Sequence, residues 1–279
     1  MIIDWKKIAS ILYEELRREI SKLNRKPTLW VILVWDNASS LRYINQKKKS
    51  AEDLWINFEL IKLSSNINEV TLLSMVEKLN NDDTISWFMI QAPLPDHIDF
   101  NKIMCSIKPE KDVDWFHPEN QWKVLIWDNS GMVPCTPAWI MKIIASLEIE
   151  LEWKIVTVIW RSNIVWKPIA ALLINKWATV IVCNSKTKSI SNYTQISDIV
   201  ISATWKPGIL SLDMINSNTV VIDVWFTVIW DKIFWDADFE NINLVWNKIT
   251  PVPWWVGSLT VAMLMNNTLK AEISRKWKI

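Results

Sequence analysis

Residues 154–168 read KIVTVIWRSNIVWKP and contain the strongest indication of the fold class. The β-branched run 154–159 is typical of a buried strand, and a helix is expected to begin near residue 167. Trp160 and Trp166 stand where a turn between strand and helix would normally have glycine. If both positions were glycine, the segment between them would form a tight turn. Such a turn lets a pyrophosphate reach backbone N–H groups at a helix N-terminus. The spacing differs from the common G-x-G-x-x-G, so the segment alone fits an ordinary surface loop equally well.

Helix and strand patterns alternate on both sides of this segment. Strands separated by helices of ordinary length form parallel βαβ units, so the pattern predicts an α/β fold. Helices are predicted at 6–23, 39–54, 70–79, 138–147, 167–175 and 258–269, and strands at 29–34, 58–63, 85–90, 154–159, 178–183, 199–202 and 220–224.

A proline-punctuated stretch at 109–137 interrupts the alternation and predicts a domain junction. We therefore expect two domains. Residues 1–118, completed by a C-terminal helix within 258–279, form an N-terminal βαβ domain. Residues 119–257 form a Rossmann-like domain with a parallel sheet.

Composition excludes several classes of protein. The 279 residues carry 31 basic and 30 acidic side chains, which argues against a nucleic-acid partner bound by a basic field. With 50% hydrophobic residues the chain is not disordered. No apolar run is long enough to span a bilayer. The three cysteines form no CxxC pair, so we expect no disulfide framework, no metal and a reducing, cytoplasmic location.

Tryptophan and glycine occur in reversed proportions. There are 21 Trp and 3 Gly, and several Trp stand where turns are expected, as in Trp35-Asp36-Asn37 after an apolar run. We hypothesise that most or all of these positions are glycine in the functional protein. On this hypothesis the source assigns glycine to a codon that is usually a stop codon. Translating its gene with a code that assigns tryptophan to the same codon would give this pattern. The alternative is a protein truly rich in tryptophan.

Seven motifs in sequence order resemble those of one family. They are 43–47 (YINQK), 91–95 (QAPLP), 111–115 (KDVDW), 134–137 (PCTP), 160–168 (WRSNIVWKP), 221–225 (VIDVW) and 250–257 (TPVPWWVG). Together they resemble the bifunctional methylenetetrahydrofolate dehydrogenase/methenyltetrahydrofolate cyclohydrolase family over nearly the whole chain. In the family motifs, glycine stands at Trp35, Trp115, Trp139, Trp160, Trp166, Trp205, Trp225, Trp254 and Trp255.

The resemblance implies an activity. The enzyme would oxidise 5,10-methylenetetrahydrofolate with NADP and hydrolyse the resulting methenyl compound to 10-formyltetrahydrofolate. It would serve one-carbon metabolism and purine synthesis. The resemblance also implies a homodimer, with tetrahydrofolate derivatives as its substrates.

Four residues are the expected catalytic set. Tyr43 and Lys47 are four residues apart on a predicted helix and so share one face, where they could form a proton-transfer pair. The resemblance assigns proton transfer to Lys47 and pterin positioning to Tyr43. It also implies that Gln91 bonds the lysine and that Asp114 accepts the pterin N–H groups. From sequence alone, Lys47 reads as part of a solvated run and Asp114 as a turn residue.

Cofactor and folate contacts are expected at the motifs of the second half. Arg161 could pair with a 2′-phosphate, which favours NADP over NAD. The full cofactor set is Trp160, Arg161, Ser162, Ser185 and Phe226. The folate set comprises Tyr43, Gln91 and Asp114 together with Pro253 and Trp254 in the expected glycine loop.

Two alternatives remain open at this point. Another two-domain NADP oxidoreductase, such as a shikimate dehydrogenase-like protein, would share the Rossmann half. A non-catalytic folate- or nucleotide-binding relic becomes the better interpretation if the tryptophans are real, because Trp160 would block the phosphate turn.

Overall fold

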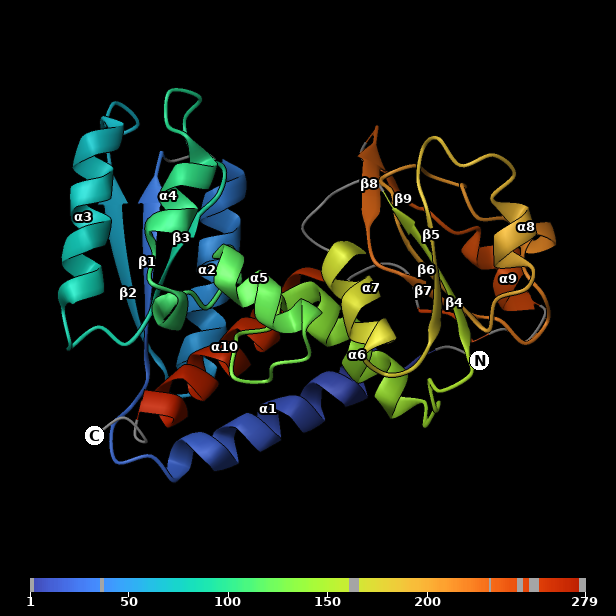
Figure 1. Cartoon of the computed structure of the whole chain (residues 1–279), viewed down its shortest axis with the longest axis horizontal. Helices are drawn as coiled ribbons and strands as arrows, with labels where there is room; N and C mark the ends of the chain where they lie inside the picture. The colour runs from blue at the N-terminus through green and yellow to red at the C-terminus, as the bar shows by residue number, and fades with distance from the viewer. Residues whose placement is uncertain are drawn as a thin grey trace. The chain divides into compact units, whose positions relative to one another are not determined.

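The computed structural model describes residues 3–35, 38–160, 166–230, 232–244, 248–250 and 256–275 (Figure 1). The chain forms two compact units. The N-terminal unit comprises 9–135 and 257–279, and the central unit comprises 1–8 and 136–256. The domain boundary predicted at 118/119 stays a prediction, because compactness alone does not locate a functional boundary.

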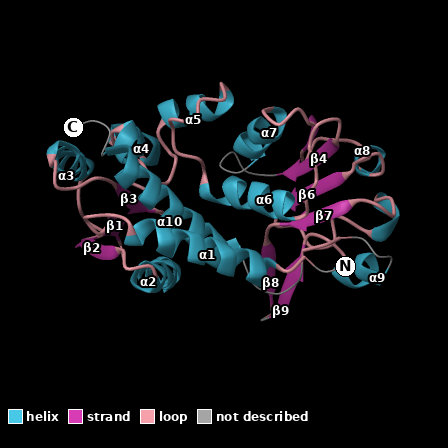
Figure 2. Ribbon diagram, turned by 90° about the horizontal axis from the view of Figure 1, so that it is seen from below, coloured by secondary structure: helices cyan, strands magenta, loops and turns pink. Residues whose placement is uncertain are grey.

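The N-terminal unit is built on a three-stranded parallel sheet. Its strands are β1 (Thr28–Val34), β2 (Asn57–Leu63) and β3 (Phe88–Gln91), in the order β2-β1-β3. The helices α3 (Glu69–Asn81) and α4 (Phe100–Ser106) cover one face and α2 (Ala38–Asp53) the other (Figures 1 and 2).

Burial explains why these segments form a sheet. Ile32 and Val34 of β1 are fully buried and belong to one core with Leu72 and Val76 of α3. At roughly 25 cal/mol per Å² of apolar surface removed from water, such contacts supply most of the free energy that holds the layers together. Two long helices complete the unit, α1 (Trp5–Ser21) and the largely buried α10 (Val256–Arg275).

The central unit is a four-stranded parallel sheet in the order β5-β4-β6-β7. Its strands are β4 (Ile155–Trp160), β5 (Thr179–Cys183), β6 (Ile199–Ala203) and β7 (Val220–Asp223). Its helices are α6 (Cys135–Ser146), α7 (Trp166–Ile174), α8 (Ser191–Thr194) and α9 (Phe239–Leu244). The predicted two-domain α/β fold with parallel sheets is therefore confirmed.

The structure adds elements that the sequence pattern did not predict. An antiparallel hairpin, β8 (Phe226–Ile229) and β9 (Lys232–Trp235), follows the parallel sheet. Within the stretch expected to be irregular lie the short 3-10 turn η1 (Pro109–Lys111) and α5 (Pro118–Leu125). Pro118 occupies the first turn of α5, where a missing N–H costs nothing, and the His117 side chain caps it. A second 3-10 turn, η2 (Leu212–Met214), precedes β7.

Backbone geometry bears directly on the excess of tryptophan. Among the described residues, ten that are not glycine have positive φ, and eight of these are tryptophan. Their φ values lie between 51° and 82°, in the left-handed region that glycine favours and a bulky side chain disfavours. These eight are Trp35, Trp55, Trp115, Trp127, Trp153, Trp177, Trp205 and Trp230. The backbone therefore supports the glycine hypothesis independently of the motifs.

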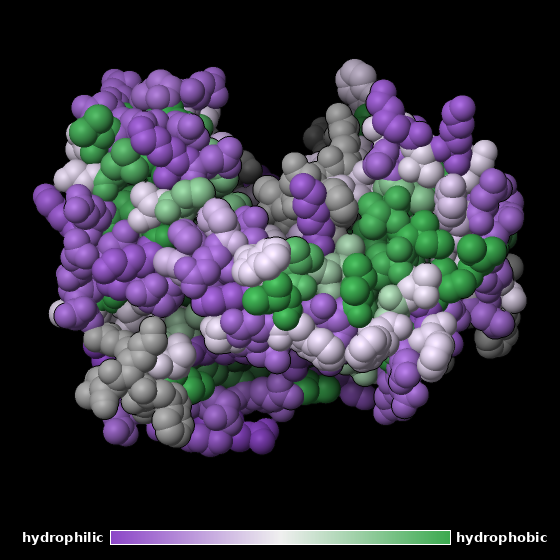
Figure 3. Space-filling view, in the orientation of Figure 1, coloured by the Kyte–Doolittle hydropathy of each residue, from purple (hydrophilic) through white to green (hydrophobic). Residues whose placement is uncertain are grey.

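Surface properties differ over the molecule. Figure 3 shows hydrophilic side chains over most of the visible face of the N-terminal unit, and a group of hydrophobic side chains on that of the central unit. Among the described helices, none is both long enough and apolar enough to cross a membrane.

Candidate active site

Lys47 and Gln91 meet at the carboxyl edge of the N-terminal sheet. Gln91 is the last residue of β3 and is buried, while Lys47 projects from α2, the helix that follows β1. The Lys47 Nζ atom donates a hydrogen bond of 2.8 Å to Gln91 Oε1. It also lies 3.3 Å from Met89 Sδ. The amide Nε2 of Gln91 bonds the Ala92 carbonyl at 2.7 Å, which fixes the direction of Oε1 toward the lysine.

The surroundings of Lys47 favour its neutral form more than water does. Burial lowers the pKa of the Lys47 ammonium, whereas the nearby Asp114 and Cys135 side chains raise it. An amine with a lowered pKa is suited to take up and release a proton near neutral pH. This environment distinguishes Lys47 from Lys48, whose side chain is 56% exposed.

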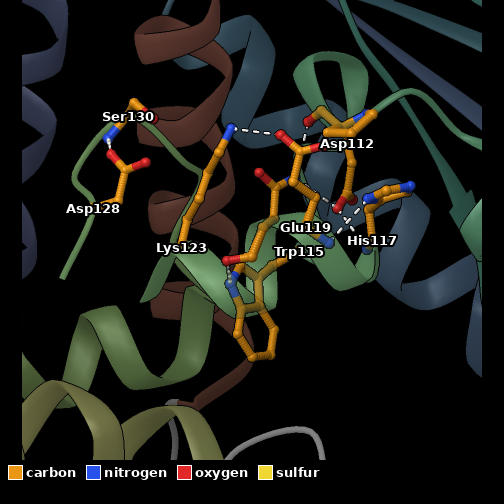
Figure 4. Close-up of polar contacts among 9 residues, drawn as sticks. Asp112, Trp115, His117, Glu119, Lys123, Asp128 and Ser130 are labelled. Carbon is orange, nitrogen blue, oxygen red and sulfur yellow. Dashed lines mark hydrogen bonds and ion pairs between the residues drawn. The ribbon is translucent and has the colours of Figure 1, made fainter. Parts of the chain in front are cut away.

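Asp112 and Asp114, two residues apart, have different environments. The Asp112 carboxylate accepts hydrogen bonds from the backbone N–H groups of Asp114 and His117 and from the Asn120 side chain. Figure 4 shows Asp112 facing His117 in the loop that leads into α5. Both carboxylate oxygens of Asp112 therefore accept hydrogen bonds that hold the conformation of this loop.

Asp114 has the electrostatics of a ligand-binding group. Burial raises its pKa to about 6, the Lys47 ammonium opposes this rise, and the charge of Asp112 adds to it. Once ionised, a carboxylate in such a buried environment accepts strong hydrogen bonds from the N–H groups of a ligand.

Cys135 belongs to the same cluster, although no role is predicted for it from the sequence. It is the first residue of α6 and is buried. Burial raises the pKa of its thiol well above the ordinary value, and the Asp114 carboxylate raises it further. The thiol is therefore neutral at physiological pH. The position of Cys135 in the PCTP motif is the sequence feature that could have indicated its place in the site.

Tyr43 lies one turn before Lys47 on α2, and its side chain is 41% exposed. An exposed aromatic ring beside a partly buried amine offers a surface on which a planar ligand can stack. The two residues lie on one side of α2, as their spacing predicts.

The central unit carries a candidate site of its own, at the carboxyl end of its sheet. The chain passes from β4 to β5 on one side and returns to β6 on the other side of β4, so the strand order reverses between β4 and β6. In open parallel sheets, dinucleotides bind outside the carboxyl ends of the strands at such a reversal. Trp160, the last residue of β4, stands at this position.

Ser185 lies at the tip of a closed turn after β5. The turn is held by the Asn184 side chain, which accepts from Lys186 N at 2.9 Å, and by Thr187 Oγ1, which accepts from Asn184 N at 2.9 Å. Ser185 is exposed there and is therefore accessible to a ligand.

A buried carboxylate organises the carboxyl end of β6. Asp236 accepts hydrogen bonds from the Ser202 hydroxyl and from the backbone N–H groups of Thr204 and Lys206. It thereby holds the loop that follows β6 beside the point of strand reversal. Burial and the charge of Asp236 raise the pKa of Asp223 well above its ordinary value.

Two features conflict with a bound dinucleotide if the tryptophans are real. The Trp160 indole is buried at the strand end, and among the described residues its Nε1 finds no hydrogen-bond partner. The indoles of Trp205 and Trp225 stack with centroids 4.7 Å apart just beyond β6 and β7. Glycine at these positions would remove both the buried indole and the stacked pair.

Several predicted contacts lie outside what the structure describes. Arg161, Ser162, Pro253 and Trp254 are outside the described residues, and only the backbone of Phe226, at the start of β8, is described. Within the described part of the chain, no group of three or more His, Cys, Asp and Glu residues is placed to hold a metal. The absence of a metal stays a prediction.

Comparison with known proteins identifies the two halves. Residues 3–114 match the family described as "Tetrahydrofolate dehydrogenase/cyclohydrolase, catalytic domain". Residues 134–276 match "Tetrahydrofolate dehydrogenase/cyclohydrolase, NAD(P)-binding domain". The chain belongs to the tetrahydrofolate dehydrogenase/cyclohydrolase family. The resemblance seen in the sequence is thus confirmed, and the shikimate dehydrogenase-like alternative is set aside.

Family members resemble the chain over its full length. The "Bifunctional protein FolD" of Campylobacter hominis is 42% identical and covers 98% of both chains. The crystal structure of the Campylobacter jejuni FolD is similar with a TM-score of 0.94 and 39% identity, covering 99% of both chains. The Trypanosoma brucei FolD, whose structure is complexed with NADP and an inhibitor, has a TM-score of 0.89 and 31% identity, covering 100% of this chain and 99% of its own.

Proposed function

We propose that this protein performs both reactions of its family. It oxidises 5,10-methylenetetrahydrofolate to the methenyl cation while NADP accepts a hydride, and it then adds water to give 10-formyltetrahydrofolate and a proton. The observation that carries the proposal is the partly buried Lys47–Gln91 pair next to Asp114, within a chain whose two halves both match the family.

Lys47 is proposed to move the proton in the hydrolytic step. Its lowered pKa suits it to take a proton from the water that attacks the methenyl carbon and to return one to the departing folate nitrogen. Gln91 holds the amine in place by accepting its hydrogen bond at 2.8 Å. This leaves the other amine hydrogens, or the lone pair, directed toward the substrate.

Asp114 and Tyr43 are proposed to bind the pterin. The Asp114 carboxylate accepts pterin N–H groups, and the exposed Tyr43 ring stacks on the pterin face. A fixed pterin places the reacting one-carbon unit against the amine of Lys47, and this positioning lowers the barrier.

The dinucleotide is proposed to bind at the carboxyl ends of β4, β5 and β6 in the central unit. When bound, NADP supplies the hydride acceptor. The protein's own contribution is to hold the dinucleotide through the β4–α7 turn, with Arg161 and Ser162, and through Ser185. Phe226 is proposed to pack near the nicotinamide end, and Pro253 and Trp254 to lie along the folate. Since folate nitrogens stabilise the methenyl cation, hydride transfer needs alignment and exclusion of water from the protein rather than an acid or base.

A second candidate function rests on the buried Trp160 indole. If the tryptophans are real, the end of β4 is filled and the protein is a folate- or nucleotide-binding relic without dehydrogenase activity. Assays of the protein from its native source separate the two candidates.

Two assays test the proposed function. Methylenetetrahydrofolate with NADP should yield NADPH and 10-formyltetrahydrofolate, and methenyltetrahydrofolate alone should be hydrolysed without NADP. Binding of both ligands with neither turnover would support the relic instead. NADPH formation without hydrolysis would remove the cyclohydrolase half of the proposal.

A homodimer in the cytoplasm is also proposed. The family resemblance supports the dimer, and the three unpaired cysteines are typical of a reducing compartment. Light scattering of the purified protein measures the assembly, and a mass of one chain would contradict the dimer.

A further inference from the structure

Asn267 joins three segments of the N-terminal unit from the middle of α10. It is 1% exposed. Its Nδ2 donates hydrogen bonds to the Val113 carbonyl at 3.1 Å and to the Val133 carbonyl at 2.8 Å. The same nitrogen lies 3.8 Å from Cys135 Sγ. Since both carbonyls can only accept, the amide must present its nitrogen to them.

The first of these bonds fixes the peptide that carries Asp114. The carbonyl of Val113 and the N–H of Asp114 belong to one peptide group. Asn267 binds its carbonyl, and the Asp112 carboxylate accepts from its N–H at 3.2 Å. A peptide plane held on both sides cannot rotate, so the direction in which the Asp114 side chain leaves the backbone is set.

The second bond fixes the approach to Cys135. Val133 lies two residues before Cys135, and Pro134 between them has a restricted φ. By holding the Val133 carbonyl, Asn267 restrains the backbone that leads to Cys135, and therefore where the Cys135 thiol lies. One amide thus orients both the Asp114 carboxylate, whose charge acts on Lys47, and the neutral Cys135 thiol beside it.

We propose that Asn267 is a positioning residue for the folate site, which acts through Asp114 and Cys135 on Lys47. This inference rests on the proposed function. The Asn267 Oδ1 atom has no hydrogen-bond partner among the described residues. A buried acceptor left unpaired is costly, so stability alone does not account for an amide here. An amide is suited to this place because its two N–H groups reach two carbonyls at once.

Thr268 provides a matched control on the same helix. It is as buried as Asn267, and its hydroxyl donates to the Leu264 carbonyl within α10 at 2.8 Å. Thr268→Val removes one buried hydrogen bond and keeps the side-chain volume, but it leaves the hydrogen bonds to Val113 and Val133 in place. Loss of helix stability alone therefore affects both variants, while loss of positioning affects only Asn267→Ala.

The test compares these variants in the full-length protein. In Asn267→Ala, kcat/KM for methenyltetrahydrofolate hydrolysis should fall by about tenfold to 100-fold, as expected for a displaced catalytic group. The acid limb of the pH profile should move from near pH 6 toward lower pH, because a freed Asp114 carboxylate becomes more hydrated. The Kd for NADP, measured by calorimetry, should not change. Thr268→Val should keep both kcat/KM and the acid limb.

Specific outcomes overturn the proposal. An unshifted acid limb with a folate KM within about twofold of the parent, or equal losses in Thr268→Val, would show that Asn267 has only a structural role. If Asn267→Ala does not fold, Asn267→Ser keeps one donor and should show a smaller change in the same direction, and parent-like behaviour of that variant overturns the proposal. The parent is assayed first, so an inactive parent contradicts the proposed function and not the role of Asn267.

Discussion

The ammonium of Lys47 lies 2.8 Å from the side-chain oxygen of Gln91, and this contact joins α2 to the end of β3 at the carboxyl edge of the N-terminal sheet. Two segments 44 residues apart thereby place an amine of lowered pKa at a fixed point. In parallel βαβ units the carboxyl edge is where such groups converge.

Lys47→Met should abolish hydrolysis. Methionine keeps the length of the side chain and removes the proton carrier, so cyclohydrolase kcat should fall by about 10³-fold. Hydride transfer should survive to the extent that folate still binds. Lys48→Met is the control, because Lys48 is exposed and its carboxylate partner Glu52 is 4.0 Å away. Full hydrolysis of methenyltetrahydrofolate by Lys47→Met would exclude Lys47 from the proton transfer.

Folate binding should weaken as the pH falls through about 6. Binding uses the ionised Asp114 carboxylate, whose pKa burial raises to about 6, so KM should rise about tenfold for each unit below that value. The folding stability of the ligand-free protein changes with pH in the opposite direction to folate binding. The raised pKa favours the folded state below pH 3.8, and this contribution is lost as pH rises through about 6.

Asp114→Asn should remove this pH dependence and raise KM at neutral pH. Asp128→Asn is the control, because hydrogen bonds from Ser130 lower the pKa of Asp128 and it does not titrate near pH 6. A steady-state series from pH 5 to 8 measures both variants. An acid limb that persists in Asp114→Asn would assign it to another group.

Trp153→Gly should stabilise the protein. Trp153 has φ of 66° and is 86% exposed, so glycine relieves backbone strain and loses little packing, a gain of about 1 kcal/mol. Trp122 is also exposed but lies inside α5, where glycine should cost about 0.5 kcal/mol. Urea denaturation of the two variants measures the contrast. A loss of stability in Trp153→Gly would contradict the strain argument.

Peptide mass spectrometry of the protein from its native source should find glycine at 153, 160 and 166 within residues 152–167. This result would establish that the phosphate turn is open. Tryptophan at these positions would favour the relic without dehydrogenase activity.

Much of the fold could be predicted from the sequence because local signals coincide there. β1 and β4 are short β-branched runs that end in turn positions, and both form close to the predicted bounds. The β8–β9 hairpin is not predicted because its two-residue connection at 230–231 is printed Trp-Asp, which lacks the glycine that usually marks such a turn. The short helix α5 was missed because a proline and a histidine cap, which start it, look like loop signals.

The candidate site was predictable only where a motif marks it. Lys47 and Gln91 are far apart in sequence, and only the fold shows that they touch. Without the family motif, the sequence does not distinguish Asp112 from Asp114, since the difference lies in which donors surround each carboxylate. Asn267 sits in a helix without any local signal, and its partners lie more than 130 residues away in the chain.

Isotope transfer tests the central claim most directly. Methylenetetrahydrofolate carrying deuterium at both hydrogens of the one-carbon unit is supplied with NADP, and the products are analysed by mass spectrometry. The account predicts that one deuterium appears in the reduced cofactor and the other in the formyl group of 10-formyltetrahydrofolate. Reduced cofactor without deuterium, or no reduced cofactor from a protein that binds both ligands, would contradict it.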